Sequence, residues 1–334
     1  MLATPVVVHR GSVNGPRPIN IRRDIRQILE LLELAFGPVL DADGRRLLSS
    51  RADLSSQAAF TMSMNLRNRE FNPGFVWEES GRIVGNISLI QSKIPGRYLI
   101  ANVAVHPNYR RRGIARVLMQ EGLEHIGRHR GQEILLQVES SNEAAIHLYY
   151  SLGFNTLGMI RRWETNTRRL RNLPVGEAEN MEIRPLRRQD WRAAYRLDRA
   201  SSNPDLHWPA PIAADHYKPG IWQWLNNLLN GQKSETWITT SPVTGEEQRQ
   251  LIGLASIKSE WGRPHSVELR VLPSWRGEIE RPLLAKVIRR LRYLRGDNIL
   301  LDHLADDEIV NELLVEANFQ TRRYLTFMKR KIGG

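Results

Sequence analysis

The stretch that decides the fold is Val103-Ala-Val-His-Pro-Asn-Tyr-Arg-Arg-Arg-Gly-Ile-Ala115. A strand-like run over Tyr98–Val105 ends at His106-Pro107, passes through an arginine-rich turn and enters a helical pattern at Gly113. A helix start offers unpaired backbone N–H groups and the positive end of the helix dipole, which together bind phosphate. The sequence therefore predicts an anion site at this turn.

The residue types in the turn favour a bound anion over an ordinary solvated basic turn, which is the alternative interpretation. Arginines at the start of a helix oppose the helix dipole, so a cluster of them is easier to understand beside a negative charge. Glycine permits close approach of the backbone. The residues predicted to form the anion site are Arg110, Arg111, Arg112, Gly113, Ile114, Ala115 and Arg116.

The segments around the turn alternate between strand and helix patterns. Further strands are predicted at Ile19–Ile21, Gly74–Glu79, Arg82–Ile90, Glu133–Val138 and Phe154–Glu164. Apolar residues at helical spacing follow Ile21, and a capping box at Ser140–Glu143 opens a helix that ends at Gly153. Residues 37–72 are interpreted as helix plus mobile loop. The layout is typical of an α/β (α+β) protein.

The pattern occurs twice along the 334 residues. Three pairs of segments correspond in the same order, at offsets of 162, 166 and 165 positions: Ile19–Arg23 with Met181–Pro185, Val105–Arg110 with Val271–Arg276, and Leu152–Phe154 with Ala317–Phe319. Nearly equal offsets indicate a duplication of one fold. We expect a tail over residues 1–18, a first domain over 19–168, a linker over 169–180 and a second domain over 181–334.

Two motifs of the first copy resemble signatures of the GNAT (GCN5-related) N-acetyltransferase superfamily. Arg110-Arg-Arg-Gly-Ile-Ala115 matches Gln/Arg-x-x-Gly-x-Gly/Ala, and Asn142–Phe154 matches Asn-x-x-Ala-x-x-Leu-Tyr-x-x-x-Gly-Phe. The resemblance covers about residues 19–164 and is closest to the ribosomal-protein and small-amine branches. It implies two tandem GNAT-like domains, each with a mixed, mostly antiparallel twisted sheet flanked by helices.

The resemblance also implies acetyl-CoA as the acetyl donor, with no metal. The pantetheine arm would pair like an extra strand with main-chain groups of Val103, Ala104 and Val105. The pyrophosphate would lie on the N–H groups of Arg111–Ala115. Asn142 would cap its helix and contact the cofactor arm, or act only as a cap.

For the chemistry, the resemblance implies that Tyr149 donates a proton to the departing thiolate and that a main-chain N–H near Val103 stabilises the oxyanion. The alternative for Tyr149 is a purely structural core aromatic. The general base stays open between Glu139, Glu78, Glu79 and a water molecule.

The second copy lacks the motif residues at the positions that the chemistry requires. Gly113 corresponds to Ile279 and Ala115 to Arg281, while Tyr149 corresponds to Leu314 and Asn142 to Asp307. We predict a degenerate GNAT-like domain that does not bind acetyl-CoA. Seven of the nine Trp residues lie in this half, and the Pro-rich loop Ser202–Gly220 could line an acceptor pocket; the alternative is that they fill a core or an interface.

The leading hypothesis is a cytoplasmic N-acetyltransferase that moves an acetyl group to a primary amine by direct attack, the acceptor being a small molecule or a protein N-terminus. The alternative is a non-catalytic acyl-CoA-binding module that engages a protein partner. The sequence has no cysteine, which excludes disulfides and thiol nucleophiles. A net charge of +12 suggests nucleic-acid binding as a third hypothesis, but no nucleic-acid-binding motif in the sequence supports it. No apolar run is long enough to predict a membrane span.

Overall fold

The structure is a computed structural model that describes residues 14–37, 72–175, 182–201, 203–207, 216–218, 232–242, 249–294 and 298–332. The helix and loop predicted over residues 37–72 lie outside these ranges except at their ends.

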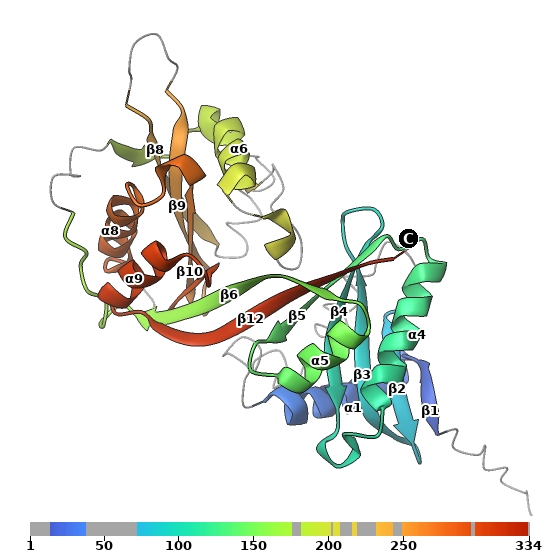
Figure 1. The fold of residues 1–334 in the computed structure, drawn as a ribbon. Helices are drawn as coiled ribbons and strands as arrows, with labels where there is room; N and C mark the ends of the chain where they lie inside the picture. The colour runs from blue at the N-terminus through green and yellow to red at the C-terminus, as the bar shows by residue number, and fades with distance from the viewer. Residues whose placement is uncertain are drawn as a thin grey trace, which may run out of the picture. The chain divides into compact units, whose positions relative to one another are not determined.

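The same order of elements appears twice along the chain (Figure 1). The strands of the first copy are β1 (Gly15–Pro18), β2 (Gly74–Glu79), β3 (Arg82–Gln91), β4 (Arg97–Val105), β5 (Glu133–Glu139) and β6 (Asn155–Asn166). Those of the second are β7 (Ile183–Pro185), β8 (Lys233–Thr240), β9 (Leu251–Ser259), β10 (His265–Val271), β11 (Asn298–Leu304) and β12 (Gln320–Lys331). The predicted duplication is therefore confirmed.

The helices repeat in the same way. The first copy has α1 (Ile21–Phe36), α4 (Ile114–Arg128) and α5 (Glu143–Ser151), and the second has α6 (Trp191–Ser201), α8 (Glu280–Leu291) and α9 (Glu308–Glu316). The short 3-10 turns η1 (Pro107–Tyr109) and η6 (Pro273–Trp275) precede α4 and α8. The strands join in the order β1-β2-β3-β4-β5-β12-β6-β11-β10-β9-β8-β7, with β4–β5 and β10–β11 parallel.

The chain divides into two compact units that do not follow chain order. One comprises Met1–Leu136, Leu152–Phe154 and Lys329–Gly334, and the other comprises Gln137–Ser151 and Asn155–Met328. The domain boundaries expected from the sequence stay a prediction. Leu170 and Leu173, in the expected linker, are buried in the core of the second unit, whereas residues 176–180 lie outside the described ranges.

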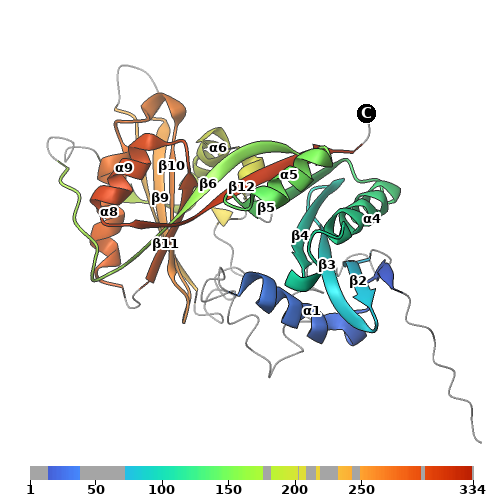
Figure 2. The ribbon, with the colours of Figure 1, turned by 60° about the horizontal axis from the view of Figure 1, so that its bottom comes forward.

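In the first unit, α1 and α4 cover opposite faces of β2–β4 (Figure 2). Ile28, Leu31 and Leu32 of α1 pack against the sheet in one apolar cluster. On the α4 side the contact is so close that a Cβ on Gly85 of β3 would lie 2.8 Å from Ile114. Glycine is required at this point because the helix rests on the strand backbone.

In the second unit, β9 packs against α8 in the same manner. A Cβ on Gly253 would lie 2.6 Å from Ile279 and 2.7 Å from Leu283. Residues of α8, α9 and β9–β11 form one large apolar core, and α6 packs in a separate cluster with Ile238 and Leu254.

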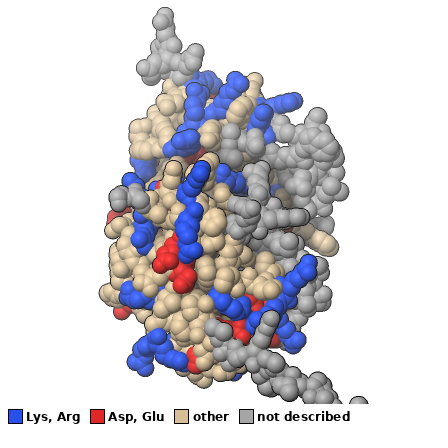
Figure 3. Space-filling view, turned by 90° about the vertical axis from the view of Figure 1, so that its right-hand side faces the viewer, with Lys and Arg blue, Asp and Glu red and all other residues tan. Residues whose placement is uncertain are grey.

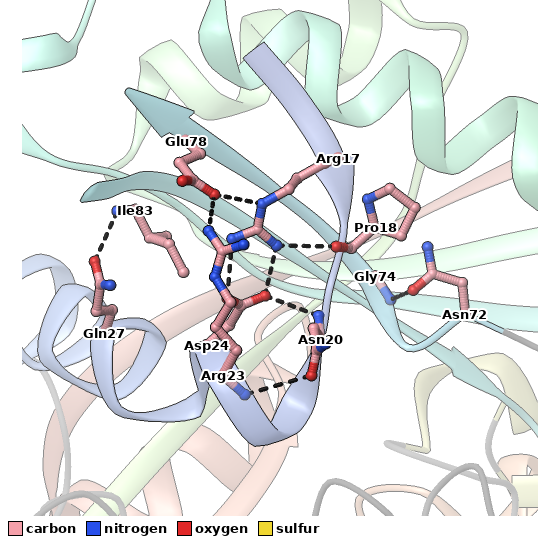
Figure 4. A network of polar contacts seen from close by, with 10 residues as sticks. All are labelled: Arg17, Pro18, Asn20, Arg23, Asp24, Gln27, Asn72, Gly74, Glu78 and Ile83. Atoms are coloured by element: carbon pink, nitrogen blue, oxygen red, sulfur yellow. Dashed lines mark hydrogen bonds and ion pairs between the residues drawn. The ribbon is translucent and has the colours of Figure 1, made fainter. Parts of the chain in front are cut away.

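An arginine–carboxylate pair fastens the first strand of each copy to the helix that follows it. Arg17 of β1 binds Asp24 of α1 through two hydrogen bonds of 2.6 and 2.9 Å (Figure 4). Arg184 of β7 binds Asp190 through equivalent bonds of 2.7 and 3.0 Å. A planar guanidinium suits this bidentate geometry. Arg17 and Arg184 are therefore structural equivalents, 167 positions apart.

This equivalence corrects the start of the first copy. The strand predicted at Ile19–Ile21 is wrong, because the strand covers Gly15–Pro18 and Ile21 begins α1. The 162-residue offset drawn from the prediction is wrong for the same reason, and residues 15–18 belong to the sheet rather than to a tail. Strand β1 tolerates its two prolines because it lies at the edge of the sheet, where fewer backbone N–H groups have to donate hydrogen bonds.

We expect Gly85→Ala to destabilise the fold by about 1–3 kcal/mol, because the added methyl group forces α4 away from β3. Urea unfolding followed by circular dichroism measures the change. The matched control is Gly127→Ala in α4, where the new Cβ meets only Ile332 at 3.9 Å and better helix propensity favours folding. Equal stability of Gly85→Ala and the wild type would contradict the packing argument.

Candidate functional site

Strand β4 leaves its regular pairing before it reaches the turn. Its parallel pairing with β5 covers Arg97–Ile100, although the strand continues to Val105. A β-bulge interrupts its pairing with β3, and Asn102 adopts a left-handed φ of 53°. The Asn86 side chain donates to the Asn102 carbonyl at 2.9 Å. Beyond the bulge, Ala104 and Val105 pair again with β3, whereas the pairing of β4 with β5 ends at Ile100.

The predicted anion turn is open at its helix start. Gly113 is the N-cap of α4, has a φ of 77° and makes no side-chain cap hydrogen bond. Among the described residues, apart from its two chain neighbours, no heavy atom lies within 4 Å of the position that its Cβ would take. The orphan N–H groups of the first helical turn are therefore approachable from outside the chain.

Arginines surround this open turn. The side chains of Arg110, Arg111, Arg112 and Arg116 are exposed. Arg110 Nε donates to the Val105 carbonyl at 3.3 Å, and Arg112 lies 3.1 Å from Glu79 and over the Tyr109 ring. The structure thus brings together the predicted anion-site residues in one unit, at the positive end of a helix.

The corresponding turn of the second copy is filled by the chain itself. Glu280, the first residue of α8, accepts hydrogen bonds at Oε2 from the N–H groups of Gly277 at 2.8 Å and Ile279 at 3.2 Å. The residue is only 1% exposed, and burial raises the pKa of its carboxyl group. Sequence analysis missed this role, although an acid stands where the first copy has Ile114.

Asn142 and Tyr149 lie on α5 in the second unit. Asn142 Oδ1 accepts from the Ala145 N–H at 3.2 Å, which is the expected cap geometry. Tyr149 is only 5% exposed, and burial raises the pKa of its phenol. The hydroxyl therefore holds its proton at neutral pH, as a proton donor must.

The three candidate bases differ in their surroundings. Glu78 is bound by Arg17 at 2.5 Å and by Arg23, within the network that holds β1 and α1 (Figure 4). Glu79 pairs with Arg112. Glu139, at the end of β5, lies 3.4 Å from Arg323, and burial raises the pKa of its carboxyl group although Arg323 and Arg162 lower it.

Metal-binding groups and membrane-spanning helices are absent from the part of the chain that the structure describes. The described residues contain no group of three His, Asp or Glu side chains able to hold a metal ion, and no described helix is long and apolar enough to cross a membrane. On the face drawn in Figure 3, basic side chains are dispersed, with acidic ones between them.

The first copy is similar to known acetyltransferases. The acetyltransferase (GNAT) family model matches residues 30–154. N-alpha-acetyltransferase RimI of Mycobacterium tuberculosis is 38% identical over 85 residues, which cover 25% of this chain and 52% of that protein. The [ribosomal protein bS18]-alanine N-acetyltransferase of Escherichia coli is 38% identical over 66 residues, 20% of this chain and 45% of that protein. The chain thus spans about half the length of these relatives.

Solved structures match the fold along nearly the whole chain. A GCN5-related N-acetyltransferase from Sphaerobacter thermophilus aligns with a TM-score of 0.64 at 15% identity, over 96% of each chain. A tandem GNAT protein from the clavulanic acid biosynthesis pathway aligns with a TM-score of 0.54 at 17% identity, over 96% of this chain and 98% of that one. Residues 30–154 therefore match the acetyltransferase (GNAT) family model, and the fold of the chain is that of two GNAT-like domains in tandem.

Proposed function

We propose that the protein is an N-acetyltransferase that uses acetyl-CoA and carries out its chemistry in the first copy. The observation that carries the proposal is the open start of α4. Gly113 leaves it without a side-chain cap, whereas in the second copy a buried carboxylate closes the same position. An open, arginine-flanked helix start suits the pyrophosphate of a nucleotide cofactor.

The residues present fit this cofactor. Acetyl-CoA, when bound, supplies an acetyl group activated as a thioester. Main-chain groups of Val103, Ala104 and Val105 would pair with its arm, since the pairing of β4 with β5 ends at Ile100. The N–H groups from Arg111 to Ala115, with the Arg110, Arg112 and Arg116 side chains, would hold its phosphates, and Asn142 would contact the arm.

Proton transfer falls to two side chains with raised pKa values. Glu139 would accept the proton of the acceptor amine, directly or through water, and Tyr149 would donate its proton to the leaving sulfur. A main-chain N–H near Val103 would stabilise the oxyanion. The role of Tyr149 rests on the Leu-Tyr-x-x-x-Gly-Phe motif and on its burial.

The acceptor is a primary amine. Relatives named for acetylation of a protein α-amine and of ribosomal protein bS18 alanine favour a protein N-terminus, and a small amine is the other class. We place the protein in the cytoplasm, where acetyl-CoA is available. The second copy keeps the fold but does not bind acetyl-CoA, because Glu280 occupies its anion turn.

We expect Gly113→Val to weaken CoA binding at least tenfold, because a branched side chain blocks approach to the helix start. Isothermal titration with CoA measures this affinity. The matched control is Gly277→Val in the second copy: that glycine also has a left-handed φ, of 91°, and its Cβ would meet only Ile309 at 3.6 Å. Loss of affinity in the control alone would move the CoA site to the second copy.

Tyr149→Phe should lower kcat about 100-fold and leave the KM for acetyl-CoA unchanged, since only a proton donor is removed. Thiol release with a panel of amines and N-terminal peptides measures both constants. Tyr150→Phe is the control, because the Tyr150 hydroxyl is exposed and bonds Thr156. Wild-type rates for Tyr149→Phe would remove the residue from the mechanism.

Glu139→Gln should lower kcat about 10- to 100-fold. In the wild type, kcat should fall as the pH decreases, because a protonated Glu139 cannot accept a proton. The fall should occur at a higher pH than for an ordinary glutamate, because burial raises the pKa of Glu139. A pH profile of kcat with a single acceptor tests this, with Glu79→Gln as control. An identical acid limb in Glu139→Gln and the wild type would assign the base elsewhere.

A further inference from the structure

The second unit holds a cluster of charged side chains between α6, β9 and β10 that the proposed function does not use. Arg270 Nε donates to Asp198 Oδ1 at 2.7 Å, and their side chains are only 12% and 4% exposed. Lys258 Nζ lies 2.6 Å from Glu268 Oε1. Buried ion pairs rarely stabilise a fold more than apolar residues of similar volume would. The cluster therefore calls for another explanation.

Three oxygen atoms in this region are buried and have no hydrogen-bond partner among the residues that the structure describes. They are Glu268 Oε2, the Tyr217 hydroxyl and Ser256 Oγ. Tyr217 is 6% exposed and Ser256 is 2% exposed. Burying such groups unpaired is costly, so a ligand that pairs with them would gain affinity.

These oxygens lie on one side of the sheet. Ser256 and Glu268 face each other in the β9–β10 ladder, so their side chains are neighbours. Tyr217 belongs to an apolar cluster with Leu254 of β9 and with residues of α6. The side chains of Leu254 and Ser256 lie on the same face of the sheet, because they are two residues apart on one strand. Burial raises the pKa of Tyr217, and the Asp198 and Glu268 carboxylates raise it further. The Tyr217 side chain thus packs on the face of β9 that carries Ser256.

The charges leave Glu268 Oε2 available as an acceptor. Lys258 occupies the other oxygen of that carboxylate. Arg270 is bound to Asp198 and, together with Lys258, lowers the pKa of the Glu268 carboxyl group against the effect of burial. His216 Nε2 is 3.9 Å from Glu268 Oε2, too far for a hydrogen bond. Burial lowers the pKa of His216, helped by Lys258. The imidazole is therefore neutral near pH 7 and does not neutralise the carboxylate.

We propose that Glu268, Tyr217 and Ser256 bind the primary ammonium group of a small amine. An ammonium group has three N–H donors and no acceptor, and these three oxygens offer three acceptors, one of them ionised. A hydrogen bond to a charged group is the strongest kind available here. The site belongs to the second copy and does not rest on the acetyl-transfer proposal.

Binding is measured on the full-length protein without acetyl-CoA, with methylammonium chloride as probe. The comparison ion is tetramethylammonium at the same concentration, which has the charge but no N–H group. We expect methylammonium to raise the thermal unfolding midpoint in a saturable manner and tetramethylammonium to leave it unchanged. An equal response to both ions would overturn the proposal, as would no response to methylammonium.

Two variants place the binding at this cluster. Tyr217→Phe and Ser256→Ala each remove one hydroxyl group and should raise the Kd for methylammonium about tenfold. Tyr195→Phe is the control. Tyr195 is half-buried and packs against the same apolar cluster as Tyr217, and its variant should keep the wild-type Kd. Wild-type affinity in Tyr217→Phe would contradict the site. If Glu139→Gln loses affinity for methylammonium and Tyr217→Phe does not, the amine binds at the proposed transfer site instead. This result does not depend on whether acetyl transfer occurs.

Discussion

The sheet is completed by strands that the two copies exchange. Strand β12, the last of the second copy, lies between β5 and β6, and β6 lies between β12 and β11. Backbone bonds fix the new neighbours: Ile332 N–H donates to the Gln132 carbonyl at 2.7 Å, and Ser140 N–H donates to the Tyr324 carbonyl at 2.9 Å. Buried backbone groups must be paired. Each copy therefore needs a strand of the other to satisfy its own sheet.

This dependence constrains which parts of the duplication can change. β6 and β12 have equal lengths and remain 165 positions apart, as expected where each strand is held on both sides. The turns before α4 and α8 carry no such restriction, and there one copy has an open glycine and the other a buried glutamate. A carboxylate satisfies the same N–H groups that a phosphate would. The turn of the second copy is thus satisfied by a side chain of its own chain.

Local patterns in the sequence predicted most of the strands and the helices around the motifs, because apolar periodicity and caps are set by neighbouring residues. β1 was misplaced because Gly15-Pro16-Arg17-Pro18 has none of the residues that favour strands; the bidentate Arg17–Asp24 pair reveals its role only in three dimensions. The exchange of β6 and β12 was beyond prediction, since strand partners far apart in sequence leave no local signal. Glu280 and the cluster at Glu268 were missed because a single acidic residue does not indicate whether it is buried.

Equivalent positions in the two copies show how the two proposed sites relate. Asn102 of β4 and Glu268 of β10 are 166 positions apart, the same offset as η1 and η6. In the first copy, Asn102 donates to Ser88 Oγ at 3.1 Å beside the β-bulge. In the second, the strand pairs without interruption and Glu268 faces Ser256. The first copy thus has an amide side chain and interrupted pairing at this position, before a turn whose helix start has no side-chain cap. The second has a regular strand with a half-buried carboxylate, and the buried Glu280 carboxylate accepts from the N–H groups of its turn.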